Sequence, residues 1–170
     1  MDALEALFSR RSIRKFTAEP VTEETLQKII EGAMSAPSAG NQQPWHFVVI
    51  KDRKLLDQIP AIHPHSLMCR EALVAILICG DPTLEKHQGY WVQDCSAATE
   101  NLLLSAHSLG LGGVWVGIYP REDRITGLRK LLHVPEHIFP FALVPIGHPA
   151  ERKPARPDRY NETRIHKDTW

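Results

Sequence analysis

The chain has 170 residues, of which 43% are hydrophobic and 24% charged, which suits one globular domain with a substantial core. Twenty basic residues balance twenty acidic ones, so nothing in the overall charge favours binding to nucleic acid or to an anionic membrane. No apolar run is long enough to span a bilayer, and the N-terminus lacks a secretory pattern. The three cysteines, Cys69, Cys79 and Cys95, predict neither a disulfide framework nor a metal site. We therefore expect one cytoplasmic domain over residues 1–170.

Hydrophobic periodicity predicts helices and strands along the whole chain. Asp2 and Thr22 are N-cap candidates for the first two helices, and the first helix carries Leu4, Leu7 and Phe8 on one face. In chain order, the expected elements are a helix at 2–9, a helix at 22–34, a strand at 45–50, a short helix after Asp52, a strand at 72–79, a helix at 89–109, a strand at 114–118, a helix at 121–132 and a strand at 139–146. This order predicts a single α+β or α/β domain with helices over a central sheet.

The longest expected helix, at 89–109, is apolar on more than one side, which indicates a central helix between the sheet and another layer, such as a second subunit. The glycines at 110–113 do not fit the spacing G-x-G-x-x-G, and we interpret them as a helix stop. The segment 147–170 is polar and rich in proline and basic residues. It cannot form a core of its own, so we expect it to be frayed or to be an arm packed on another surface.

A cluster of basic residues follows the first helix, where Arg10, Arg11 and Arg14 surround Ser12. Guanidinium groups offer paired donors that match a phosphate, and a neighbouring hydroxyl adds a further donor. In a helical turn, the first and last of these arginines would lie on one side. A solvated basic face is the alternative, and spacing alone favours it.

The loop at 37–44 combines small residues with the amides of Asn41, Gln42 and Gln43. Small residues let a backbone approach a planar ligand closely, and amides can donate and accept hydrogen bonds at once. A heteroaromatic ring with alternating N–H and C=O groups would suit such a loop. A hydrophilic connection is the alternative, and it is favoured when the loop is taken by itself.

Other chemically interesting residues have structural interpretations. His63 and His65 flank Pro64, which is not a recognised ligand spacing, so we interpret them as part of a surface loop. Cys79 is expected to be a buried structural thiol. Trp115 is expected to belong to the core unless a cofactor ring covers it.

Three segments, in the expected order, resemble the nitroreductase family. Residues 10–16 (Arg-Arg-Ser-Ile-Arg-Lys-Phe) are similar to its opening signature, residues 35–50 to its second motif, and residues 158–166 to the basic tail of its short members. The likeness covers essentially the whole chain. It implies an α+β fold with a central, mostly antiparallel sheet flanked by helices. It also implies an intertwined homodimer with FMN at the interface, in which the arm at 147–170 packs on the partner subunit.

The resemblance also implies which residues bind the cofactor. Arg14 is the candidate for electrostatic catalysis at the N1/O2 side of the flavin, Asn41 for a hydrogen bond to the ring, and Arg159 for a second phosphate contact, with Arg156 as a weaker one. A backbone N–H in the segment 115–117 could meet the flavin N5. The full set of cofactor contacts is Arg10, Arg11, Ser12, Arg14, Pro37, Ser38, Asn41, Trp115, Val116, Gly117 and Arg159.

The activity implied is that of an FMN-dependent oxidoreductase. It would take hydride from NADH or NADPH and reduce a flat organic acceptor, such as a nitroaromatic or a quinone, by a ping-pong mechanism. Larger family members carry an acidic residue near the position of Gly117 and extra helices over the pocket, and this chain carries neither. A non-catalytic FMN carrier or sensor, and a small α/β interaction domain without flavin, are the alternatives.

Overall fold

The computed structural model describes residues 1–170, except for the side chain of Pro157. The α-helices are α1 (Ala3–Ser9), α2 (Glu23–Met34), α3 (Arg53–Ile62), α4 (Trp91–Ser108) and α5 (Glu122–Leu132). The strands are β1 (Trp45–Ile50), β2 (Val74–Gly80), β3 (Gly112–Gly113), β4 (Val116–Gly117) and β5 (Phe139–Gly147). Short 3-10 helices are η1 (Ala39–Asn41), η2 (Pro64–Arg70), η3 (Pro82–Leu84), η4 (Pro157–Arg159) and η5 (Glu162–Arg164). The expected helices are all present, in the expected order.

One sheet lies at the centre of the fold, with strand order β1-β2-β5-β3 and with β4 also paired to β5. All these strand pairs are antiparallel, which confirms the predicted α+β class. Successive residues of β2 enter opposite faces, so that Ile76 and Ile78 join one hydrophobic cluster while Leu77 joins the other. Because both faces are covered, β2 is buried along its whole length, as the continuous apolar run predicts.

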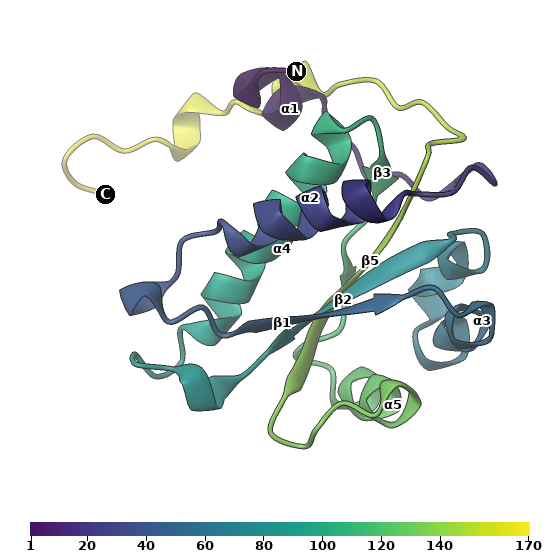
Figure 1. The fold of residues 1–170 in the computed structure, drawn as a ribbon. Helices are drawn as coiled ribbons and strands as arrows, with labels where there is room; N and C mark the ends of the chain where they lie inside the picture. Colours follow the sequence, from purple (N-terminus) through teal and green to yellow (C-terminus); the bar gives the residue numbers. More distant parts are fainter.

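Two layers of helices enclose the sheet: α2 and α4 cover one face, and α3 and α5 cover the other (Figure 1). Side-chain N-caps fix where α1 and α2 begin. The side chain of Asp2 accepts the Glu5 N–H at 2.8 Å, and the Thr22 hydroxyl accepts the Thr25 N–H at 3.1 Å, so both predicted N-caps are confirmed. Within the described residues, the helices are all too short or too polar to cross a membrane.

Helix α4 is apolar on two sides because α2 packs against the side that the sheet leaves open. A Cβ atom at Gly32 would stand 2.0 Å from the Ser105 Oγ, and the Asn101 side chain donates a hydrogen bond to the Gly32 carbonyl at 3.2 Å. The second layer predicted for this helix therefore belongs to the same chain. A second subunit is not needed to explain its pattern.

The strand predicted at 114–118 is wrong in detail, because two short strands, β3 and β4, replace it. Glycine at 112 has a packing role beyond ending a helix: a Cβ there would stand 2.6 Å from the Ile13 Cβ. Ser12 forms a parallel bridge with Gly113. The glycines thus let the arginine segment approach the edge of the sheet, while Gly110, at φ +81°, ends α4 as expected.

Both ends of the chain carry exposed surface that is unusual for a single globular domain. On α1, Leu4, Leu7 and Phe8 are 62%, 52% and 72% exposed. The described backbone after Gly147 forms two short 3-10 helices and one bridge, between Phe16 and Pro149. These segments lie together beyond one end of α4 (Figure 1).

Candidate active site

The arginine segment is held on the sheet edge by backbone hydrogen bonds. The Ile13 N–H donates to the Gly113 carbonyl at 3.0 Å, and the Thr17 N–H donates to the His148 carbonyl at 2.9 Å. Ile13 and Phe16 are buried in the core and anchor the segment from below. It is therefore an extended strip between β3 and the residues that follow β5, in which Arg10 and Arg11 are half-buried and Arg14 is exposed.

A cavity of about 380 Å³, here called the basic cavity, brings this strip together with the C-terminal segment. It is lined by Arg11, Ser12, Arg14, Lys153, Arg156 and Arg159. Partial desolvation and the positive charges of Arg156 and Arg159 lower the pKa of Arg11. Cations that repel one another around a cavity favour an anion between them, and this set of donors suits a phosphate group.

Two residues of this region were not predicted. The Lys153 Nζ donates to the Ser12 carbonyl at 2.7 Å and lies 3.1 Å from the Glu151 carboxylate. Glu151 accepts the Arg14 N–H at 2.6 Å, and this hydrogen bond lowers the pKa of its carboxyl group. The two contacts with Ser12 and Arg14 join residues more than 130 positions apart, so local pattern could not reveal them.

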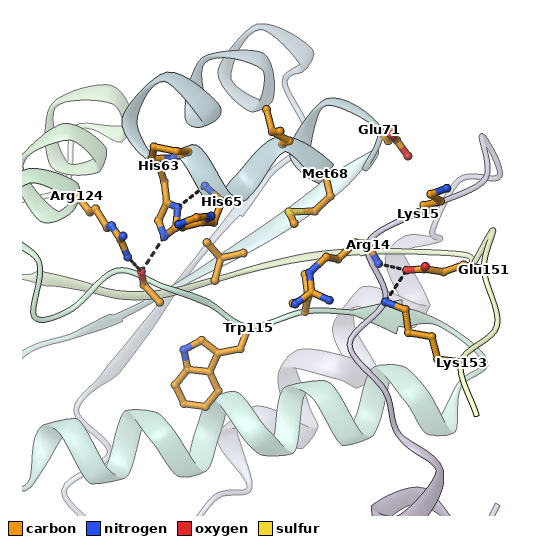
Figure 2. A pocket seen from close by; sticks show the side chains of 15 residues that line it. Arg14, Lys15, His63, His65, Met68, Glu71, Trp115, Arg124, Glu151 and Lys153 are labelled. Atoms are coloured by element: carbon orange, nitrogen blue, oxygen red, sulfur yellow. Dashed lines mark hydrogen bonds and ion pairs between the residues drawn. The ribbon is translucent and has the colours of Figure 1, made fainter. Parts of the chain in front are cut away.

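A larger cavity of about 820 Å³, here called the strand-edge cavity, is shown in Figure 2. Arg14 and Lys153 line both this cavity and the basic cavity, so the two adjoin. Its lining residues are Arg14, Lys15, His63, Pro64, His65, Leu67, Met68, Glu71, Val114, Trp115, Val116, Gly117, Arg124, Glu151 and Lys153. The predicted residues Trp115, Val116 and Gly117 are thus brought to the same place as Arg14.

The backbone of Gly117 faces the strand-edge cavity. The next N–H, of Ile118, donates to the Phe141 carbonyl at 3.1 Å, so in this antiparallel pair the N–H and C=O of Gly117 point away from β5. The Gly117 carbonyl accepts hydrogen bonds from Arg124 at 2.9 Å and from His63 at 3.0 Å (Figure 2). Its N–H lies on the same open edge, where the sequence predicted a backbone donor.

The interpretation of His63 as a surface-loop residue is wrong, because this histidine is only 2% exposed. Its Nδ1 accepts the His65 N–H at 3.2 Å, which leaves Nε2 as the donor to Gly117. Burial and the positive charge of Arg124 lower the pKa of His63. The ring is therefore a neutral support for the strand edge. His65 itself is exposed, as expected.

We expect the free energy of unfolding to decrease as the pH falls below 6.5, the ordinary pKa of histidine. The unfolded chain then takes up a proton that folded His63, with its lowered pKa, does not, so stability is greatest above this pH. Replacing His63 by glutamine should cost about 1–3 kcal/mol at pH 8 and should flatten this dependence. Urea unfolding from pH 8 to pH 5.5 measures both. His65→Gln is the control and should keep the wild-type slope; an unchanged slope in His63→Gln would contradict the assignment.

The loop with Pro37, Ser38 and Asn41 lies elsewhere in the chain. The Ala39 N–H donates to the Asp94 carboxylate at 3.0 Å, near the N-terminal end of α4. Ser9, just before the arginine segment, contacts His107 at 2.7 Å near the other end. Residues 94 and 107 are about 20 Å apart along the helix. Within one chain, this loop and the arginine segment therefore lie near opposite ends of α4 (Figure 1).

Arg10 has a different environment from its neighbours. Its Nε lies 3.2 Å from the Glu100 carboxylate on α4, and it is not among the described residues that line the basic cavity.

Two further residues can be compared with their predicted environments. Cys79 is the buried thiol that we expected, and burial raises its pKa to about 12. Trp115 is 36% exposed and packs its ring edge-on to Phe141, so it is only partly a core residue.

Several known proteins are similar to this chain in sequence and fold. The chain matches the Nitroreductase family model over residues 7–68 and 68–148. A protein of Methanothermobacter thermautotrophicus named "Putative NADH dehydrogenase/NAD(P)H nitroreductase" is 51% identical over 170 residues, which are 100% of this chain and 88% of that protein. A crystal structure of a protein of the same name from Parabacteroides distasonis has a TM-score of 0.94 and 41% identity, over 98% of each chain. An FMN-dependent nitroreductase from Clostridium difficile has a TM-score of 0.91 and 28% identity, over 98% of this chain and 99% of that one. The chain belongs to the nitroreductase family.

Proposed function

We propose that this protein is an FMN-dependent oxidoreductase that takes electrons from NADH or NADPH. The observation that carries the proposal is the junction of the two cavities at Arg14 and Lys153. A ligand with a phosphate at one end and a hydrogen-bonding ring at the other matches a cluster of cations beside an open strand edge. The names of the relatives, NAD(P)H nitroreductase and FMN-dependent nitroreductase, point to the same chemistry.

The residues present fit FMN in their chemistry. Arg11, Ser12, Arg156 and Arg159 would hold the phosphate, because together they offer guanidinium forks and a hydroxyl around one cavity. Arg14, on the side shared with the strand-edge cavity, would face the pyrimidine edge of the ring. When bound, FMN supplies two-electron redox chemistry, and the protein binds and orients it.

Two groups of this chain would tune that chemistry. A guanidinium at position 14 would stabilise negative charge at the ring edge by electrostatic attraction. The Gly117 N–H would donate a hydrogen bond from the strand edge. The side chains of His63 and Arg124, which hold the Gly117 carbonyl, would keep that donor in place. In this scheme, the protein contributes neither a nucleophile nor a carboxylate pair.

We further propose a homodimer in which each FMN site draws on both subunits. The exposed apolar face of α1 is the first support, because such a patch marks an interaction surface. The second is the separation of about 20 Å between the Asn41 loop and the arginine segment along α4. The loop of the partner subunit could complete the site, with the arm at 147–170 packed across the interface. A two-fold axis would then create two equal sites.

The acceptor is proposed to be a flat organic molecule, such as a nitroaromatic or a quinone, that uses the same open cavity as the nicotinamide. One shared position for donor and acceptor gives ping-pong kinetics.

A cytoplasmic location is also proposed. Its support is that Cys69, Cys79 and Cys95 are all free thiols, as is usual in a reducing compartment.

The test is a visible spectrum of the purified protein before and after anaerobic NADH or NADPH. We expect flavin absorbance that bleaches with at least one nicotinamide and returns when a quinone is added. Flavin that binds but does not bleach would favour the carrier or sensor alternative. A protein that stays colourless after incubation with FMN would overturn the proposal.

A further inference from the structure

A buried carboxylate holds the loop that presents Asn41. Asp94 lies in the first turn of α4 and is 5% exposed. One of its oxygens accepts the Ala39 N–H at 3.0 Å, and the other accepts the Gln42 Nε2–H at 2.6 Å. The carboxylate thus fastens both ends of η1 to α4. A negative charge at this end of a helix is also favoured by the helix dipole.

Gln42 carries the connection further into the structure. Its side chain is 6% exposed, and its Oε1 accepts the N–H groups of Lys86 at 2.9 Å and His87 at 3.1 Å. The amide can therefore be placed in only one orientation, with its nitrogen toward Asp94 and its oxygen toward the 86–87 backbone. In each of these hydrogen bonds, from Ala39 through Asp94 and Gln42 to the 86–87 backbone, a donor faces an acceptor.

The loop needs this support because its backbone is strained. Gly40, Asn41 and Gln43 have φ values of +54°, +53° and +48°, in the left-handed region that non-glycine residues rarely adopt. Such conformations persist only where the surroundings hold them, and they occur frequently at ligand-binding sites. A Cβ at Gly40 would stand 2.8 Å from the His87 ring, so this position of the loop has room only for glycine.

The two sides of the loop have different roles. Pro37 and Asn41 are exposed, whereas the Ala39 N–H and the Gln42 side chain point inward to Asp94. The Gln43 Nε2 donates to the Asn41 Oδ1 at 3.0 Å, which fixes the Asn41 amide with its NH₂ group directed away from Gln43. The network thereby orients an outward amide that the proposed function places against the flavin ring.

We propose that Asp94, acting through Gln42, is a positioning residue for flavin binding by the Asn41 loop. The proposal rests on the proposed function. Asp94 itself would not touch the cofactor; it would set the loop geometry before FMN arrives. Its contribution would therefore be seen in FMN affinity rather than only in the stability of the fold.

The direction of each hydrogen bond provides a sharp test. In Asp94→Asn, the new amide can accept from Ala39, but its NH₂ group then faces the NH₂ group of Gln42. Turning Gln42 over would place its NH₂ group against two backbone N–H donors. In Gln42→Glu, two carboxylates meet in a buried site. The double variant Asp94→Asn/Gln42→Glu restores a donor opposite every acceptor and keeps the net charge.

The experiment uses full-length protein stripped of FMN and titrated with FMN by fluorescence quenching, with the thermal midpoint of each apoprotein measured alongside. Each single variant should raise the Kd for FMN about tenfold or more, and the double variant should return it to within about threefold of wild type. Asp123→Asn, at an exposed carboxylate on α5, is the matched control and should bind FMN as wild type does.

The outcomes are distinct. Single variants that bind FMN like wild type but melt earlier would show a purely structural role and overturn the proposal. A double variant that binds no better than the weaker single variant would also overturn it. If a single variant does not fold, the double variant decides alone, by whether it folds and binds FMN. Wild-type protein that binds no FMN would instead refute the proposed function itself.

Discussion

Replacing Arg14 by alanine is expected to raise the dissociation constant for FMN by about 10- to 150-fold, which corresponds to about 1.5–3 kcal/mol for a lost charge-assisted contact. The Arg14 side chain lines both cavities, so its loss affects the phosphate end and the ring end together. Turnover at saturating FMN should also decrease, because the cation facing the ring edge is removed. The backbone N–H that pairs with Glu151 is kept, so the fold should tolerate the change.

FMN titration and anaerobic stopped-flow reduction measure these two effects separately. Arg14→Lys should lie between wild type and the alanine variant, because it keeps the charge but loses the guanidinium fork. Arg121→Ala is the control, since Arg121 is an exposed arginine at the start of α5 that pairs with Asp123 at 3.6 Å. Wild-type FMN occupancy together with a wild-type reduction rate in Arg14→Ala would remove Arg14 from the site.

The double substitution Leu4→Glu/Phe8→Glu is expected to convert the proposed dimer into monomers at micromolar concentration. Burial of an aromatic or leucine side chain contributes about 1.5–3 kcal/mol, and a carboxylate forced into an apolar interface adds a further penalty. The dimer dissociation constant should therefore rise by about 100-fold or more. FMN should be lost in parallel, because the site would no longer receive the loop of the partner subunit.

Sedimentation velocity, with absorbance followed at the flavin band, measures mass and cofactor together. Val49→Glu is the matched control: this valine is 39% exposed on β1, away from α1, and its replacement should leave the mass unchanged. A wild-type protein that sediments as a monomer at micromolar concentration would refute the dimer. A monomeric double variant that retains FMN would show that the site is complete within one chain.

Most of the fold could be predicted because its determinants are local. The N-caps Asp2 and Thr22 and the continuous apolar run of β2 are short-range signals, and each agrees with the structure. The short strand β3 was missed, and its Gly112 packs closely against Ile13, which is far away in sequence. Periodicity carries no information about such a contact.

The candidate site was predictable only in part, for a related reason. Arg11, Ser12 and Arg14 carry donor groups whose chemistry can be read from residue type, and they do line one cavity. His63 supports the site from inside the fold, by a hydrogen bond to a carbonyl 54 residues away, so its role depends on tertiary structure. The separation of the Asn41 loop from the arginines likewise follows from the length of α4.

Core packing and phosphate binding depend on different stretches of the chain. The buried residues of both hydrophobic clusters end at Ile146, whereas Lys153, which contacts the Ser12 carbonyl, is followed by Arg156 and Arg159. A chain truncated after Gly147 would therefore keep every residue of both clusters and lose three of the six residues that line the basic cavity. Such a truncation would separate the folding of the domain from the binding of a phosphate.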